Sequence, residues 1–249
     1  MSLPIWTPDA LSSELRAWTG PCWRLVEAQH YVSTLKLVDT LAEQALLEDI
    51  LEASKPSIPL ECRHLDYLLA TPFRYGAVYP HGSRFRRAGR TAGVFYGAEH
   101  ADTAVAEMVF YRLLFFSDSP ATPLPDNAAE YTAFRVTLNT SATLDLTQPA
   151  LDADAALWTH PTDYAACQAL ADAGREIGTE LIRFQSVRDP KGGANLAVMS
   201  CRAFATPAPE ERQTWRIRLN ESGAQALCAF PATGLEFSRA DFARDPRRV

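Results

Sequence analysis

Arginine is concentrated in one short stretch of an otherwise acidic chain. The segment GSRFRRAGR, residues 82–90, holds four arginines, and Arg74 lies upstream. Residues 67–98 contain no Asp, Glu or Lys, although the whole chain has a formal net charge of −6. The planar guanidinium of arginine can bind phosphate through two parallel hydrogen bonds. From the residues alone, three uses remain open: a solvated surface, a pocket for a small phosphate ligand, and a nucleic-acid patch.

A second candidate for chemistry is Glu107, in the stretch TAVAEMVFYR. Most of its neighbours are apolar, and an isolated carboxylate is costly to bury among apolar side chains unless it is paired. One interpretation is a glutamate that faces solvent or pairs with Arg112. The other is a carboxylate held in a pocket, where it could stabilise an oxocarbenium-like centre during cleavage of a glycosidic bond.

Ser186 lies near the end of ELIRFQSV, a stretch whose alternation directs it to the same face as Ile182 and Phe184. Its hydroxyl is either satisfied by nearby backbone groups or available to a ligand. The chain has no G-x-S-x-G motif and no sequence sign of a base, which disfavours a serine nucleophile.

Three tyrosines, Tyr75, Tyr96 and Tyr111, could stack on a ligand or donate a hydrogen bond to it, or simply pack in the core. Tyr111 follows Glu107 by four residues, so the two share a face on a helix. The five cysteines and five histidines form no C-x-x-C pair and show no ligand spacing. We therefore expect buried free thiols and no metal site.

The elements that must position these residues follow from the periodicity of the chain. Helices are predicted over residues 35–53, 61–69, 100–116 and 162–178, and strands over 93–98, 131–138, 142–147, 180–187, 194–200 and 214–219. Pro72 is expected to limit the second helix, and Asp102 is a plausible N-cap of the third. No repeat or linker is evident, so the pattern predicts one α+β domain with a helical N-terminal part.

The composition is that of a soluble globular protein, with 47% hydrophobic and 22% charged residues among 249. A chain of this size can bury a real core. Its longest apolar runs are far too short to span a membrane. The N-terminus has neither a basic start nor a continuous apolar segment, unlike a signal peptide. We expect a cytoplasmic protein with no membrane partner.

Four stretches together resemble the RES-domain family: TPFRY (71–75), GSRFR (82–86), GVFYGAEHADTAVAE (93–107) and SVRDP (186–190). The resemblance covers roughly residues 22–206. The arginine, glutamate and serine of the family name fall by position on Arg74, Glu107 and Ser186. Compact members commonly have a glycine pair and then Arg-Trp-Asn where this chain has residues 82–86, so the second arginine is either Arg84 or Arg86.

The resemblance implies a fold and an activity. RES proteins are toxins of bacterial toxin–antitoxin pairs, with a compact mixed α/β core similar to that of ADP-ribosyltransferase toxins. The expected architecture is therefore α+β, an ADP-ribosyltransferase-like mixed sheet core with flanking helices. Residues 1–60 would form a helical N-terminal extension packed on the core, and residues 61–249 the RES domain. The usual partner is an Xre-type antitoxin whose C-terminal part blocks the cleft.

The resemblance also implies that NAD is the substrate and is cleaved at the nicotinamide–ribose bond, by hydrolysis or phosphorolysis. Some members instead transfer ADP-ribose to a protein, which is the alternative function here. The diphosphate of NAD would be bound by Arg74 with Arg84 or Arg86. Tyr96 and Tyr75 would form an aromatic wall for the nicotinamide ring.

Glu107 would stabilise the positive charge that develops on the ribose as nicotinamide leaves. Ser186 would fix the ribose or the nicotinamide amide, and no metal is required. Arg87 and Arg90 would remain at the surface, as a possible contact for an acidic partner segment. A third hypothesis is a nucleic-acid-binding module that uses the arginines of residues 84–90; it predicts an affinity that falls steeply with salt.

Overall fold

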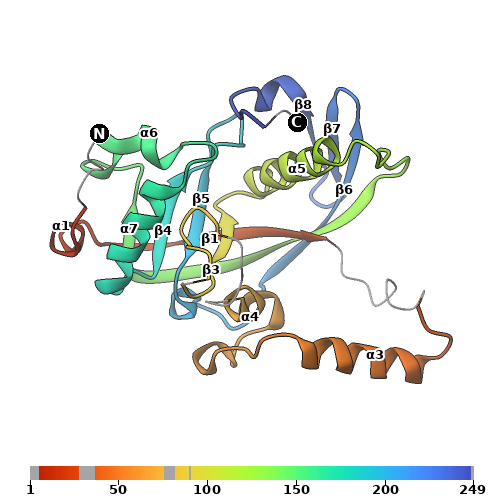
Figure 1. Cartoon of the computed structure of the whole chain (residues 1–249), viewed down its shortest axis with the longest axis horizontal. Coiled ribbons are helices and arrows are strands. Elements are labelled where there is room, and N and C mark those ends of the chain that lie inside the picture. Colours follow the sequence, from red (N-terminus) through yellow and green to blue (C-terminus); the bar gives the residue numbers. More distant parts are fainter. Residues whose placement is uncertain (1–5, 28–36, 76–81, 90, 248–249) are drawn as a thin grey trace.

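The computed structural model describes residues 6–27, 37–75, 82–89 and 91–247. Arg90 lies outside these ranges. In the described chain one mixed sheet has the order β1-β2-β5-β4-β3-β6-β7-β8 (Figure 1). Its strands are β1 Arg16–Glu27, β2 Phe95–Ala98, β3 Ala129–Asp145, β4 Leu181–Gln185, β5 Ala194–Val198, β6 Glu211–Asn220, β7 Gly223–Cys228 and β8 Thr233–Ser238. Among these described strands, only β3 and β4 pair in parallel.

Helices flank this sheet, so the predicted α+β class with a mixed sheet and flanking helices is confirmed. The α-helices are α1 Pro8–Ser12, α3 Leu41–Ser54, α4 Tyr67–Arg74, α5 Ala101–Asp118, α6 Ala155–Trp158 and α7 Ala165–Glu176. Short 3-10 turns are η1 Leu60–Cys62, η2 Leu151–Asp154, η3 Cys201–Ala203 and η4 Arg239–Phe242. Figure 1 shows α5 on one side of β1, with α3 and α4 on the other.

The prediction of a helical N-terminal part is wrong for residues 16–27, which form β1. This strand pairs with β2 and, over nearly its whole length, with β3. Because β1 pairs with both β2 and β3, strands β1, β2, β5, β4 and β3 close into a ring. Trp23 and Leu25 point from β1 into the core beside α5, the two-residue alternation of a strand.

Strand β3 unites the two strands predicted at 131–138 and 142–147. The polar residues between them continue the ladder, with Asn139 opposite Thr19 and Thr140 opposite Trp18. The length of β3 lets it pair with β6 near its start and with β4 near its end. It is therefore the strand that connects the closed ring to the β6–β8 meander.

Helix α4 begins at Tyr67, where Asp66 caps it by accepting a hydrogen bond from Leu68 N at 2.8 Å. The helix includes Pro72, so the expected end before that residue is wrong. Proline removes one backbone donor, and α4 ends two residues later, at Arg74.

Helix α5 confirms the prediction over 100–116, but its N-cap is His100. Asp102 lies in the first turn instead, where a negative charge is favourable. Apolar side chains surround most of the helix: the buried ones include Val105, Val109 and Phe110. They pack against β1, β3, β6 and β7, so α5 is fixed in a buried position that holds Glu107 at the sheet.

Helix α3 corresponds to the helix predicted at 35–53 and starts with a capping box formed by Thr40 and Glu43. Its predicted apolar face does not pack in the described core: Leu41, Leu46 and Ile50 are 81%, 60% and 57% exposed. Figure 1 shows α3 extending along the edge of the molecule. The ion pair between Glu52 and Arg74 joins it to the end of α4.

Gly97 permits the close approach of β2 to β1. A Cβ at this position would lie 2.4 Å from Cys22 Sγ and 2.8 Å from the carbonyl oxygen of Trp23. Replacing Gly97 with Ala is therefore expected to lower the free energy of unfolding by about 1–3 kcal/mol. Urea denaturation measures the change. G234A is the matched control, because its Cβ would meet the flexible end of Leu227 at 3.1 Å; equal losses in both variants would contradict the prediction.

Candidate active site

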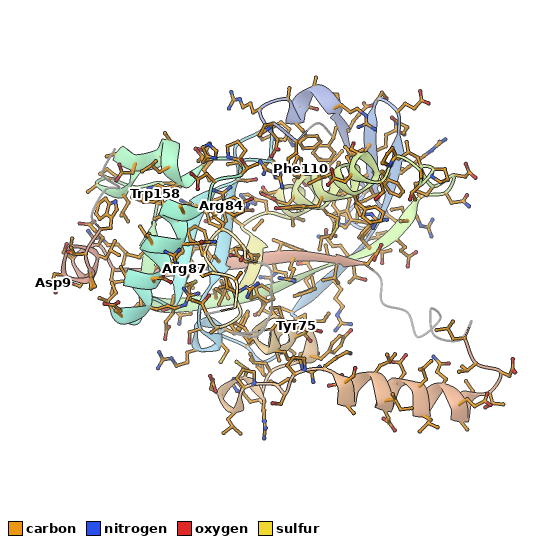
Figure 2. The ribbon with its side chains drawn as sticks, viewed as in Figure 1. Asp9, Tyr75, Arg84, Arg87, Phe110 and Trp158 are labelled. Atoms are coloured by element: carbon orange, nitrogen blue, oxygen red, sulfur yellow. The ribbon has the colours of Figure 1, made fainter. Side chains whose placement is uncertain are left out.

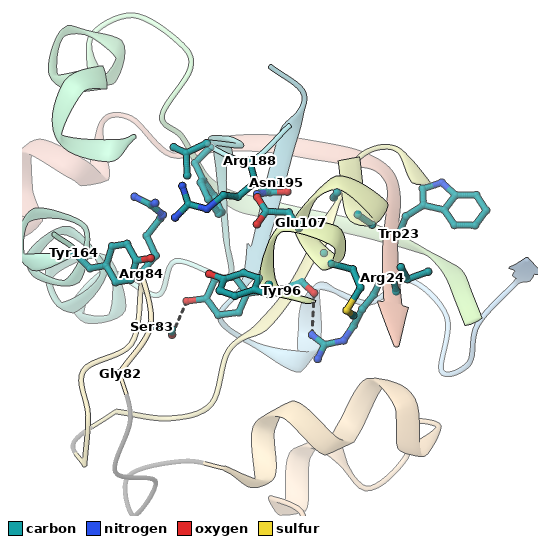
Figure 3. A pocket seen from close by; sticks show the side chains of 18 of the residues that line it. Trp23, Arg24, Gly82, Ser83, Arg84, Tyr96, Glu107, Tyr164, Arg188 and Asn195 are labelled. Carbon is teal, nitrogen blue, oxygen red and sulfur yellow. Dashed lines mark hydrogen bonds between the residues drawn. The ribbon is translucent and has the colours of Figure 1, made fainter. Parts of the chain in front are cut away.

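A pocket of about 520 Å³ opens between β1, β2, α5 and the loop that begins at Gly82 (Figure 3). Among the described residues, the charged side chains that line it are Arg24, Arg84, Glu107, Arg188 and Arg247. Its aromatic lining is Trp23, Tyr96, Tyr111, Tyr164 and Phe184. The pocket thus surrounds one carboxylate with arginines and aromatic rings.

Glu107 is held by two side chains from the sheet. Its Oε1 accepts a hydrogen bond from Ser186 Oγ at 2.7 Å and another from Asn195 Nδ2 at 2.5 Å. Asn195 lies on β5 and Ser186 follows β4, and both are buried. Charged acceptors strengthen such hydrogen bonds, so the carboxylate is fixed in place within the pocket.

Ser186 fits the first interpretation of its sequence, a hydroxyl satisfied by nearby backbone groups, and it also contacts Glu107. Its Oγ accepts hydrogen bonds from Arg188 N at 3.2 Å and Asp189 N at 3.0 Å while its hydroxyl donates to Glu107. The backbone turn after β4 therefore fixes the oxygen, and the proton points to the carboxylate. Ser186 supports Glu107 and does not itself line the pocket.

Arg84 lies at the opposite wall, beside α6 and α7 (Figures 2 and 3). Its guanidinium donates to the carbonyl oxygens of Trp158 at 2.6 Å and His160 at 3.0 Å. The same group stacks 4.6 Å from the centroid of the Tyr164 ring. Among the described residues no carboxylate lies within ion-pair distance of Arg84, so its positive charge is available to the pocket.

The loop that carries Arg84 is anchored by Tyr96. Ser83 and Arg86 close a tight turn through reciprocal backbone hydrogen bonds. Phe85 N donates to the Tyr96 hydroxyl at 3.0 Å, and Ser83 Oγ lies 2.9 Å from it. Burial raises the pKa of Tyr96, which keeps its hydroxyl neutral. Its ring lines the pocket while its hydroxyl holds the loop.

Arg188 and Arg247 meet at a shared carboxylate. Asp245 lies 2.7 Å from Arg188 Nη2 and accepts two hydrogen bonds from the Arg247 guanidinium, both of 2.9 Å. The side chains of Arg188 and Asp245 are only 3% and 2% exposed. Arg188 stacks on Phe110, 4.2 Å from the ring centroid. Its buried Nε has no hydrogen-bond partner in the described part of the molecule.

The sequence matches the model of the RES domain over residues 58–220, about two thirds of the chain. The chain belongs to the RES domain family. It is also similar to a solved chain from the crystal structure of the M. tuberculosis MbcT–MbcA toxin–antitoxin complex. That similarity has 16% sequence identity and a TM-score of 0.43, over 80% of this chain and 85% of the other. No curated protein matches the chain.

The expected resemblance to RES proteins is thus confirmed, but the structure does not bring Arg74 to the pocket. Arg74 ends α4 and pairs with Glu52. Helix α4 packs on the face of β2 that presents Phe95, whereas Tyr96 and Ala98 point to the pocket on the opposite face. Arg74 therefore lies behind the sheet, contrary to its expected place beside Arg84.

Tyr75, next along the chain, is likewise absent from the pocket lining and lies by α4 in Figure 2. Arg86 is buried but does not line the pocket, so among the described arginines of this loop Arg84 is the one that does. Arg87 remains partly exposed, as expected of a surface residue, and pairs with Asp172 at 2.5 Å. With two of these arginines buried and the third paired, the described loop presents no exposed basic face for a nucleic acid.

Arg24 lines the pocket in a place where sequence reasoning expected a helix. Its guanidinium stacks 4.8 Å from the Phe95 ring centroid and donates to the carbonyl oxygen of Tyr96 at 2.8 Å. Burial lowers the pKa of Arg24. This side chain braces β1 against β2 at the edge of the pocket.

Other contributors were also missed from the sequence. Asn195 carried a usable signal, because it is a polar residue within the apolar stretch ANLAVMS. Arg188 lies inside a motif that resembled the family, SVRDP. Tyr164 and Arg247 had no local signal, because only the packing of distant segments brings them to the pocket.

All five cysteines are free and buried, as predicted. In the described segments no group of three or more His, Cys, Asp or Glu side chains is arranged to hold a metal ion. Nor does any described helix combine the length and apolar composition needed to cross a bilayer.

Proposed function

We propose that this RES protein cleaves the nicotinamide–ribose bond of NAD and acts as the toxin of a toxin–antitoxin pair. One observation carries the proposal: Glu107, the acid that lines the pocket in the described chain, is fixed by Ser186 and Asn195 while the other charged lining residues are arginines. This arrangement suits a substrate that has an anionic part and forms a cation as it reacts.

The lining of the pocket offers suitable partners for the parts of NAD. Its diphosphate is a dianion, and the guanidinium groups of Arg84, Arg188 and Arg247 supply positive charge with the geometry that phosphate prefers. Its two aromatic rings would lie against tyrosine side chains such as Tyr96 and Tyr111. A cavity of about 520 Å³ is of the size that binds small ligands.

The proposed chemistry needs little from the protein beyond charge and position. The C–N bond to ribose breaks, and both of its electrons pass to the nicotinamide ring, which leaves as a neutral molecule. Positive charge then develops on the ribose, and the Glu107 carboxylate stabilises it. An acceptor oxygen forms a bond with the anomeric carbon and loses its proton to the solvent. Ser186 and Asn195 hold the carboxylate in position, because each donates a hydrogen bond to it.

Product analysis with NAD tests the proposal and identifies the acceptor. With water as acceptor the products are nicotinamide and ADP-ribose; with phosphate, nicotinamide and phosphorylated ADP-ribose. Transfer of ADP-ribose to a protein, the second candidate, would label a discrete band when labelled NAD is added to a cell lysate. Absence of free nicotinamide under all three conditions would refute the proposal.

The family resemblance also supports an antitoxin of the Xre type as partner, with a segment that covers the pocket. Coexpression of such a protein should restore growth to cells that express this chain. It should also stop nicotinamide release by the purified pair.

Replacing Ser186 with Ala removes one of the two hydrogen bonds that orient Glu107. A hydrogen bond to a charged group contributes about 1.5–3 kcal/mol, so we expect nicotinamide release to slow by roughly 10- to 100-fold. Initial rates at saturating NAD measure the effect. S222A, in an exposed turn where Ser222 contacts Asn220, is the control. Wild-type rates in S186A would show that Ser186 has no part in positioning the carboxylate.

A further inference from the structure

We propose that Arg247, on the C-terminal tail, binds the diphosphate of the substrate and that Asp245 holds it in position for this role. The inference rests on the proposed function and extends it to a part of the chain that the family match does not cover, since that match ends at residue 220. No motif of the sequence pointed to this residue.

The tail reaches the pocket after β8 and η4. Arg247 lines the same cavity as Glu107, and its side chain is 32% exposed, enough for contact with a ligand. Its guanidinium lies 5.2 Å from the centroid of the Phe110 ring on α5. Because Phe110 follows Glu107 by three residues on that helix, the arginine is one helical turn from the proposed centre of reaction.

Asp245 fixes the direction of this guanidinium. Its two oxygens accept from Nε and Nη2 of Arg247, each at 2.9 Å, so the planar group is held along one edge. The Nη1 group of Arg247 takes no part in this pair, so its N–H donors can bind a ligand. Asp245 itself is buried, and its movement would leave the buried Arg188 without its ion-pair partner.

The local charge balance favours an anion. Asp245 is the shared ion-pair partner of Arg188 and Arg247. One negative charge against two positive charges leaves an excess of positive charge at this wall of the pocket. The buried Nε of Arg188 has no hydrogen-bond partner in the described chain, a second indication that a ligand completes the site. Arg84 stacks on Tyr164, a ring that also lines this wall. Three guanidinium groups around one space suit the oxygens of a diphosphate.

The test measures binding without turnover. In the E107Q background, titration calorimetry would give the Kd of NAD and of inorganic diphosphate for Arg247→Gln and for Arg244→Gln. Arg244 is the matched control, because it is an exposed arginine of the same tail that does not line the pocket. We expect R247Q to raise both Kd values by about 10- to 100-fold and R244Q by less than about twofold. In active enzyme, R247Q should raise the KM for NAD by a similar factor with little change in kcat.

Equal Kd values for R247Q and R244Q would overturn the proposal. If R247Q melts at a lower temperature than R244Q, R247K separates loss of stability from loss of the phosphate contact. Lysine keeps the ion pair with Asp245 but lacks the two parallel N–H donors of the guanidinium that bind phosphate. We expect R247K to weaken diphosphate binding by about 3- to 10-fold; wild-type affinity would again overturn the inference. Loss of diphosphate binding in R247Q, together with no NAD cleavage by wild type, would refute the proposed function while leaving the anion site in place.

Discussion

Replacing Glu107 with Gln is expected to lower nicotinamide release from NAD by about 10²- to 10³-fold, the loss seen when one electrostatic stabiliser of a transition state is removed. The amide has the shape of the carboxylate, and its oxygen still accepts from Ser186 and Asn195. The fold should therefore be unchanged while the negative charge is lost. Initial rates of nicotinamide formation, followed by chromatography, measure the effect.

E236Q is the control for Glu107, because Glu236 lies exposed on β8 and does not line the pocket. It should keep the wild-type rate. The melting temperature of E107Q should match that of the wild type, which separates loss of activity from loss of structure. Retention of more than half of the activity in E107Q would remove this residue from the mechanism.

Replacing Asp245 with Asn is expected to lower the free energy of unfolding by about 3–5 kcal/mol. The reason is that Arg188 would remain buried without a counter-charge. Arg247 would lose its partner as well. Guanidinium denaturation of the full chain measures the change. D126N, at an exposed position in the loop after α5, is the control and should change the stability by less than about 0.5 kcal/mol.

The ion pairs of Asp245 with Arg188 and Arg247 also make the free energy of unfolding depend on pH. Burial acts to raise the pKa of Asp245, but the hydrogen bonds from Arg247 and the charges of both arginines lower it overall. A carboxyl with a lowered pKa in the folded protein stabilises the fold above its unfolded pKa of about 4 and loses that effect as the pH falls. The stability gap between wild type and D245N should therefore be full at pH 7 and shrink below about pH 4. A gap that stays constant down to pH 3 would contradict the ion-pair explanation.

Local sequence patterns predicted the elements that carry the pocket's central carboxylate. The apolar residues of α5 repeat around the whole helix, and the alternation of β4 extends to Ser186. Glu107 could therefore be placed on its helix and Ser186 at the inward face of its strand end, while the direction of Glu107 remained open. Their direct hydrogen bond was not predictable, because it depends on how α5 crosses β4 and β5.

The arginines show why the rest of the site could not be predicted from the sequence. The acid-free window from 67 to 98 indicated an anion pocket, yet the compensating acids lie elsewhere: Glu52 on α3 for Arg74, and Asp172 on α7 for Arg87. A window of sequence cannot reveal partners that the fold brings from another segment. Of the cluster, Arg84 alone lines the pocket in the described chain.

The contributions of strand β1 and of the C-terminal tail to the pocket were not predictable for the same reason. Cys22 of β1 pairs with Val136 of β3, more than a hundred residues later, so no local period identifies the strand's neighbours. Arg247 reaches Phe110 from the other end of the chain. Both segments lie outside residues 58–220, the part that matches the RES domain, although both contribute lining residues to the pocket.

The central claim is that the pocket around Glu107 cleaves NAD at the nicotinamide–ribose bond. The most direct measurement is the amount of free nicotinamide formed by purified wild-type protein over time, in buffer with and without phosphate, beside E107Q. The account predicts many molecules of nicotinamide per molecule of wild-type protein, equal to the NAD consumed, and almost none with E107Q. No nicotinamide from the wild type, even with phosphate and a protein acceptor present, would contradict it.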